Sequence, residues 1–175
     1  MFCDDISAIV VHIGHLRSYI GFVGDELPIY QTDSHFYHDK NIPNSFFLID
    51  EFSPQMNLEE GIIQSILCNK RINAVNNHTF FISKLASKIN IDLQDVGVFL
   101  TTNLVDQYQE DRKLIMADLF ESRQCPALFF CSKNLTSIFA SGKSTGIVVD
   151  SGAYSTEITS IYQGHVLKKS RLISN

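Results

Sequence analysis

One stretch, from Thr145 to Leu167, constrains the fold of this chain more than any other. Its sequence, TGIVVDSGAYSTEITSIYQGHVL, opens with a short apolar run, reaches Asp150-Ser151-Gly152, and then alternates to a turn at Gln163-Gly164. This pattern predicts a strand that ends in Asp-x-Gly and folds back as a second strand. Such a hairpin leaves a carboxylate beside bare backbone N–H groups, which suits a hydrated metal ion and a phosphate.

A stretch near the N-terminus repeats this frame in altered form. Residues 8–24, AIVVHIGHLRSYIGFVG, place His12 where Asp150 stands and Gly14 where Gly152 stands. The sequence therefore predicts two hairpins of one design, of which only the second keeps its acid.

Composition limits the class of protein. With 175 residues, 45% hydrophobic and 19% charged, the chain is long enough for one folded domain or for one lobe of a larger molecule. A net charge of -5 argues against a surface built for nucleic acid, which needs clustered Lys and Arg, so no direct nucleic-acid partner is expected. The one tight basic group, Lys168, Lys169 and Arg171, is interpreted as solvated surface.

Cysteine spacing and hydropathy indicate an intracellular protein. Cys3, Cys68, Cys125 and Cys131 form no CxxC pair and no zinc pattern, so reduced thiols are expected. The sequence has neither a charged leader followed by an apolar core nor an apolar run of ~18 residues, so neither secretion nor a membrane partner is expected.

Between the hairpins, strand and helix patterns alternate, which predicts an α/β fold. The glycine at 142 should end the last helix by taking the left-handed conformation. Pro-containing residues 26–55 are expected to form an exposed excursion with extended or edge structure. The expected strands are Ile6–Ile13, Ser18–Val23, Phe46–Ile49, Gly61–Ile63, Val96–Leu100 and Pro126–Cys131; the expected helices are Ser65–Ser87, one starting near Asp106, and Lys133–Ala140.

Three segments, in order, resemble the N-terminal half of actin and the actin-related proteins. They are GFVGDELP at 21–28, VFLTTNLVDQYQEDRKLIMADLF at 98–120, and the continuous PALFFCSKNLTSIFASGKSTGIVVDSGAYSTEITSIYQGHVL at 126–167. The resemblance implies an actin-like, ribonuclease H-like ATPase domain: a mixed sheet with two β-hairpins and flanking helices. It also implies that residues 1–175 form the N-terminal lobe, large subdomain 1 with a reduced subdomain 2 insertion at about 26–60, without the second lobe.

Two details resemble the nuclear actin-related proteins of the fourth class. Lys133 stands where actin has the glutamine that orients the hydrolytic water, and Asp150 to Ala153 read DSGA where actin has a second Asp after the Gly. Ordinary drift in a fast-evolving actin-like chain is the alternative explanation of both.

The resemblance assigns a vestigial nucleotide site to the two turns. Phosphate contacts would come from Gly14, His15, Leu16, Asp150, Gly152 and Ala153, and Asp150 would hold a metal ion through water. Without the resemblance, Asp150 could be a turn-capping residue, and either glycine could serve only its tight turn.

Two substitutions in the first hairpin weaken that site. His12 replaces the first acid, and neutral imidazole is a poor partner for hydrated magnesium. Tyr19 stands at the family's phosphate lysine, so a charge-assisted contact is lost. Arg17 could replace that cation, but a solvated side chain at the hairpin tip is the preferred interpretation.

Lys133 is the sharpest departure for catalysis. Lysine has no acceptor and cannot orient a water as glutamine does, so no ATP turnover is expected. ATP with magnesium, bound weakly or not at all, is the cofactor left open, since backbone amides and Asp150 could still hold phosphates.

The sequence thus favours a non-catalytic actin-related subunit of a nuclear chromatin-remodelling or histone-acetyltransferase complex. The resemblance implies actin and a helical segment of a remodelling ATPase subunit as partners, and the nucleus rather than the cytoplasm as the location. The alternatives are a divergent ATP-binding cytoskeletal actin-like protein and, more weakly, a small-molecule kinase of the same superfamily.

Overall fold

A mixed five-stranded sheet forms the centre of the computed structural model, which describes residues 8–39, 45–51, 61–68, 71–72, 75–101, 109–167 and 170–174. β1 pairs with β9 in parallel and with β2 in antiparallel orientation. The strand order is β10-β9-β1-β2-β3. The bounds are β1 Ala8–Ile13, β2 Arg17–Phe22, β3 Tyr30–Asp33, β9 Gly97–Thr101 and β10 Leu128–Cys131.

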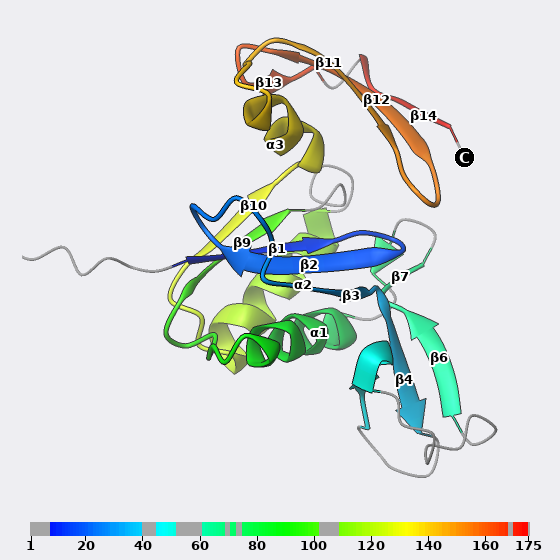
Figure 1. Cartoon of the computed structure of the whole chain (residues 1–175), viewed down its shortest axis with the longest axis vertical. Coiled ribbons are helices and arrows are strands. Elements are labelled where there is room, and N and C mark those ends of the chain that lie inside the picture. The colour runs from blue at the N-terminus through cyan, green and yellow to red at the C-terminus, as the bar shows by residue number, and fades with distance from the viewer. Residues whose placement is uncertain are drawn as a thin grey trace, which may run out of the picture.

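The alternation of β1 explains its central place. Ile9, Val11 and Ile13 are at most 2% exposed and point to one face, whereas Val10 and His12 point to the other. Helices α1 (Val75–Lys88) and α2 (Gln109–Ala117) cover the face of Ile9, and η4 (Asp118–Ser122) continues α2 as a π-helical turn (Figure 1). The α/β class predicted from the sequence is confirmed.

The first helix begins later than predicted. The expected start at Ser65 is wrong, because β6 (Gly61–Ser65) and the two-residue strands β7 (Leu67–Cys68) and β8 (Arg71–Ile72) precede α1. Leu67 is buried from a strand rather than from a helix. The expected helix start at Asp106 lies outside the described residues.

Residues 26–55 contain more buried structure than predicted. β3 extends the central sheet, and β4 (His35–Asp39) forms a second small sheet with β5 (Phe47–Leu48) and β6, followed by the 3₁₀ turn η1 (Ile49–Glu51). Phe36, Tyr37 and Leu48 are at most 3% exposed. The prediction of extended or edge structure is confirmed by β3, the edge strand of the central sheet, and a strand near Phe46–Ile49 is confirmed as β5. The prediction of an exposed excursion is wrong for the buried residues of β4 and β5.

Helix α3 (Lys133–Ala140) joins the central sheet to a separate four-stranded sheet, on the side away from α1 and α2 (Figure 1). Its bounds are those predicted, and Gly142 takes a φ of +71° directly after it. The second sheet contains β11 (Gly146–Ser151), β12 (Thr156–Tyr162), β13 (His165–Val166) and β14 (Leu172–Ser174). Both predicted hairpins are thus present.

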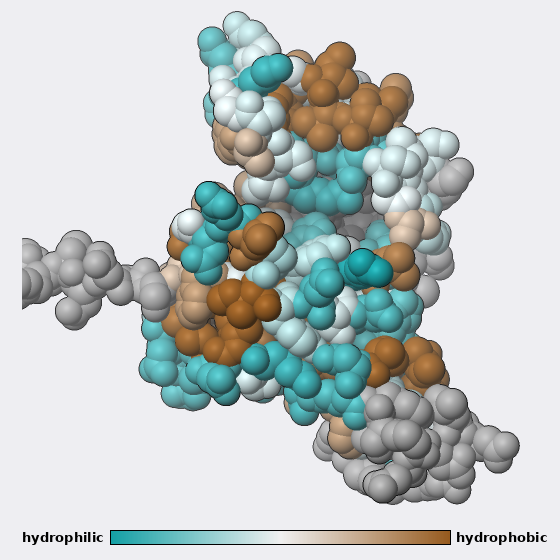
Figure 2. Space-filling view, in the orientation of Figure 1, coloured by the Kyte–Doolittle hydropathy of each residue, from teal (hydrophilic) through white to brown (hydrophobic). Residues whose placement is uncertain are grey.

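The outer face of the second sheet is apolar and exposed. Val149 pairs with Ile158, which pairs with Leu172, so these three side chains share one face with Ile147. Ile147, Val149 and Leu172 are 64–70% exposed. Figure 2 shows apolar surface gathered over β11.

Candidate phosphate site between two hairpins

The turn of the first hairpin closes through its glycine. The N–H of Gly14 donates to the carbonyl oxygen of Arg17 at 3.0 Å. A Cβ at this position would lie 2.8 Å from that oxygen, so the close approach requires glycine. Behind the turn, the buried hydroxyls of Ser18 and Ser34 are 2.7 Å apart and tie β2 to the start of β4.

The second hairpin closes in the same way. The N–H of Gly152 donates to the carbonyl oxygen of Ser155 at 3.0 Å, again three residues further on. The hydroxyls of Ser151 and Thr156 lie 3.0 Å apart across the strands. The repeated frame in the sequence therefore gives two turns of one geometry.

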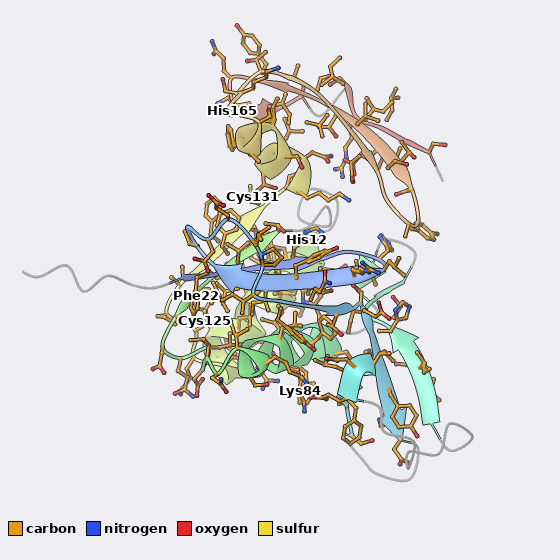
Figure 3. All side chains as sticks on the ribbon, viewed as in Figure 1. His12, Phe22, Lys84, Cys125, Cys131 and His165 are labelled. Carbon is orange, nitrogen blue, oxygen red and sulfur yellow. The ribbon has the colours of Figure 1, made fainter. Side chains whose placement is uncertain are left out.

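Both turns face one cavity of about 260 Å³. His12, on β1, lies on the side of the central sheet that faces α3 and the second sheet (Figure 3). The predicted positions that line the cavity are His12, Gly14, His15, Leu16, Arg17, Tyr19, Lys133, Gly152 and Ala153. Residues from five separate elements or turns thus line one cavity, whereas Asp150 is not among its lining residues.

Asp150 and Lys133 form an ion pair beside this cavity. The Lys133 ammonium binds the carboxylate Oδ2 of Asp150, and the two side chains are 25% and 28% exposed. Lys133 is the first residue of α3, and Asp150 is near the end of β11, so helix packing on the sheet sets the contact. The carboxylate of the second hairpin is therefore paired with a cation from α3.

His12 is held as a neutral imidazole. Its Nδ1 lies 2.7 Å from the hydroxyl of Thr101 on the neighbouring strand. Burial lowers the pKa of His12 below its ordinary value, and the Lys133 ammonium lowers it further, against smaller opposing effects of Asp150 and Thr101. At neutral pH the His12 side chain is therefore uncharged, whereas the corresponding residue of the second hairpin is Asp150.

Aromatic contacts connect the two turns. The rings of His15 and Tyr154 stack with their centroids 5.0 Å apart and an interplanar angle of 12°. His12 stacks on Tyr19 within the first hairpin, at 6.0 Å. The His15–Tyr154 stack thus joins the two turns at the edge of the cavity that both line.

A buried polar network supports the second hairpin from behind. The carboxylate of Glu157, 4% exposed, accepts from the Asn134 amide at 2.9 Å and forms an ion pair with Arg171. The same amide reaches the Thr159 hydroxyl at 2.8 Å. Only 11% of the Arg171 side chain is exposed, so its assignment to solvated surface is wrong. Lys168 and Lys169 lie outside the described residues.

The two cysteines whose side chains are described are inert in character. Cys125 and Cys131 are both buried and free, and burial raises the pKa of the Cys125 thiol. The expectation of reduced thiols holds for this pair.

A hydrated divalent cation does not fit the residues present. In the first hairpin, the position where an acid would hold the cation is occupied by His12, whose imidazole bonds to Thr101. In the second hairpin, the carboxylate of Asp150 is bound by the ammonium of Lys133. Within the described part of the chain, no group of three or more His, Cys, Asp or Glu residues could hold a metal ion. The N–H groups of Gly14 and Gly152 donate within their own turns, so the bare N–H groups expected from the sequence are not present at these two positions.

The mixed sheet, its flanking helices and the two facing glycine turns define an actin-like domain of the α/β class. Residues 3–175 match the family model described as Actin. The chain belongs to the actin family.

Among relatives, the chain resembles actin-related protein 4 of several organisms. It is 30% identical to that of Schizosaccharomyces pombe over 180 residues, which cover 95% of this chain and 38% of the relative. It is 39% identical to that of Oryza sativa subsp. japonica over 70 residues, 40% of this chain and 15% of the relative. For Arabidopsis thaliana the identity is 38% over 61 residues, 35% of this chain and 14% of the relative.

These matches make the chain an actin-related protein similar to actin-related protein 4, and it spans well under half the length of these relatives. Within the described ranges, no helix combines the length and the apolar character needed to cross a membrane.

Proposed function

We propose that this chain is part of a non-hydrolysing actin-related protein that serves as a structural and interaction subunit of a nuclear chromatin-remodelling or histone-acetyltransferase complex. The ion pair between Lys133 and Asp150 is the observation that carries this proposal. It removes the free carboxylate from the site and puts a group without an acceptor where a water would be oriented.

The rest of the site supports a loss of turnover. Neutral His12 and Tyr19 bring no charge to the first hairpin, whereas phosphoryl transfer depends on positioning and on stabilisation of developing negative charge. The buried network around Glu157 and Arg171 ties β12 to α3 and to the residues before β14. These residues thus support a structural role for the site rather than phosphoryl transfer.

The nuclear complex is what the similarity to actin-related protein 4 favours. Actin and a helical segment of a remodelling ATPase subunit are the proposed partners. The test is affinity purification of the complete tagged protein from nuclear and cytoplasmic extracts of its native cells, followed by mass spectrometry. We expect chromatin-remodelling or acetyltransferase subunits together with actin.

A matched variant sharpens this test. Lys133→Gln restores the amide that the family uses at this position and should leave the set of recovered partners unchanged, because the proposed role does not use the chemistry of the site. Recovery of cytoskeletal proteins without chromatin subunits would overturn the proposal.

A further inference from the structure

The ammonium group of Lys133 lies at the point where the two turns meet. It binds Asp150, and a Cβ added to Gly152 would be 3.9 Å from Nζ, so the group sits against the backbone of the second turn. Both Lys133 and Asp150 act electrostatically on His12 across the cavity. The Lys133 ammonium therefore binds Asp150 and is near enough to His12 to lower the pKa of that imidazole.

A divalent ion would have to displace this ammonium. Mg²⁺ prefers oxygen ligands in near-octahedral order, yet Oδ2 of Asp150 already binds the ammonium and the corresponding side chain of the first hairpin is an imidazole. Displacement would leave the partly buried Lys133 ammonium without its partner, which adds to the cost of displacement. The site as folded thus disfavours a divalent ion.

Three cationic side chains line the cavity without a metal. Lys133 is paired with Asp150 and Arg171 with Glu157, while Arg17 stands opposite Asp33 on the neighbouring strand β3. His15 and Tyr154 close the cavity between the turns with polarisable rings. Ammonium and guanidinium groups bind phosphate oxygens directly, without an intervening ion.

We propose that Lys133 takes the place of the divalent cation at this site, so that the cavity excludes Mg²⁺ and accepts a nucleoside polyphosphate without metal. This inference rests on the non-hydrolysing site of the proposed function and is independent of the complex in which the protein acts. Asp150 then serves to fix the ammonium, and Arg17 and Lys133 meet the phosphates.

Equilibrium binding of labelled ATP to the complete protein, with excess Mg²⁺ or with EDTA, tests this directly. In the unmodified protein the two dissociation constants should agree within about twofold. Lys133→Gln frees Asp150, so this variant should bind at least about tenfold more tightly with Mg²⁺ than with EDTA. Lys133→Arg keeps the ion pair and should remain independent of Mg²⁺.

The double variant Lys133→Gln/Asp150→Asn completes the comparison and should lose the dependence on Mg²⁺ again. Circular dichroism of each variant verifies that it is folded before binding is measured. Absence of saturable ATP binding by the unmodified protein, or Mg²⁺-dependent binding that Asp150→Asn abolishes, would overturn the inference. So would a Lys133→Gln variant whose ATP binding stays indifferent to Mg²⁺. None of these results changes which partners are purified, so a failure here is distinct from a failure of the proposed complex.

Discussion

The two hairpins carry the same three residues before their turns and bury them differently. Ile9-Val10-Val11 precede His12, and Ile147-Val148-Val149 precede Asp150. Ile9 and Val11 are 0% exposed, whereas Ile147 and Val149 are 70% and 64% exposed. The local sequence sets the strand and the turn, while the elements packed on each sheet decide which side chains form a core.

The helices packed beneath the two hairpins also differ in polarity. Beneath the first hairpin, α1 contributes Phe81, Ile82 and Leu85 to the core. Beneath the second, the first turn of α3 contributes Lys133 and Asn134, which bind acids of the sheet. One hairpin is held by apolar packing and the other by a polar network, and the following predictions test that difference.

The largest effect is expected in the polar network. Arg171→Met leaves Glu157 buried without its cation, which should lower the free energy of unfolding by about 3–5 kcal/mol. Urea titration monitored by circular dichroism measures the loss. The double variant Glu157→Gln/Arg171→Met removes both charges and should recover much of it. An equal loss in both variants would mean that the pair is not electrostatically coupled.

The matched apolar positions should give the next largest contrast. Ile9→Ala creates a cavity in the central core and should cost about 2–5 kcal/mol. Ile147→Ala removes an exposed side chain and should change the free energy of unfolding by no more than about 0.5 kcal/mol. Urea midpoints of the two variants, compared at equal slope, provide the measurement. Similar losses at both positions would contradict the difference in burial.

Acid should lower the free energy of unfolding through His78, which lies on α1 beneath the first hairpin. This side chain is fully buried, and neither ring nitrogen has a hydrogen-bond partner among the described residues. Burial lowers the pKa of His78 from its ordinary 6.5 to about 4. The folded state therefore favours the neutral ring, so stability is complete above pH 6.5 and falls as the pH drops toward 4.

The expected loss over that window is about 3 kcal/mol. Subtracting the pH profile of His78→Leu from that of the unmodified protein isolates the contribution of His78 from those of the carboxylates. Identical profiles of the two proteins would show that His78 does not titrate between the folded and unfolded states.

Local signals predicted the elements that glycine or alternation defines. Lys133–Ala140 was placed correctly because Gly142 ends the helix, and both hairpins were found from their glycine turns. The helix expected from Ser65 failed at its start because apolar spacing near Leu67 fits a helix and a strand equally well. The burial of Phe36 and Tyr37 on β4 was missed because it arises from pairing with β5 and β6 in the completed fold.

Local sequence signals likewise predicted some residues of the candidate site but not the contacts between them. Its glycines, His12, Asp150 and Lys133 follow from the repeated frame and the resemblance, but their pairing does not. Thr101 contacts His12 across 89 positions of sequence, which no local pattern reveals. Arg171 looked like surface charge because its partner is chosen by strand pairing rather than by neighbours in sequence.

The central claim is that the second hairpin keeps Asp150 to fix Lys133 and not to serve hydrolysis. The rate of phosphate release from ATP by the complete protein, measured beside Asp150→Ala, tests this most directly. We predict that both proteins release phosphate at the same background rate. Release that requires Mg²⁺ and disappears in Asp150→Ala would contradict the claim.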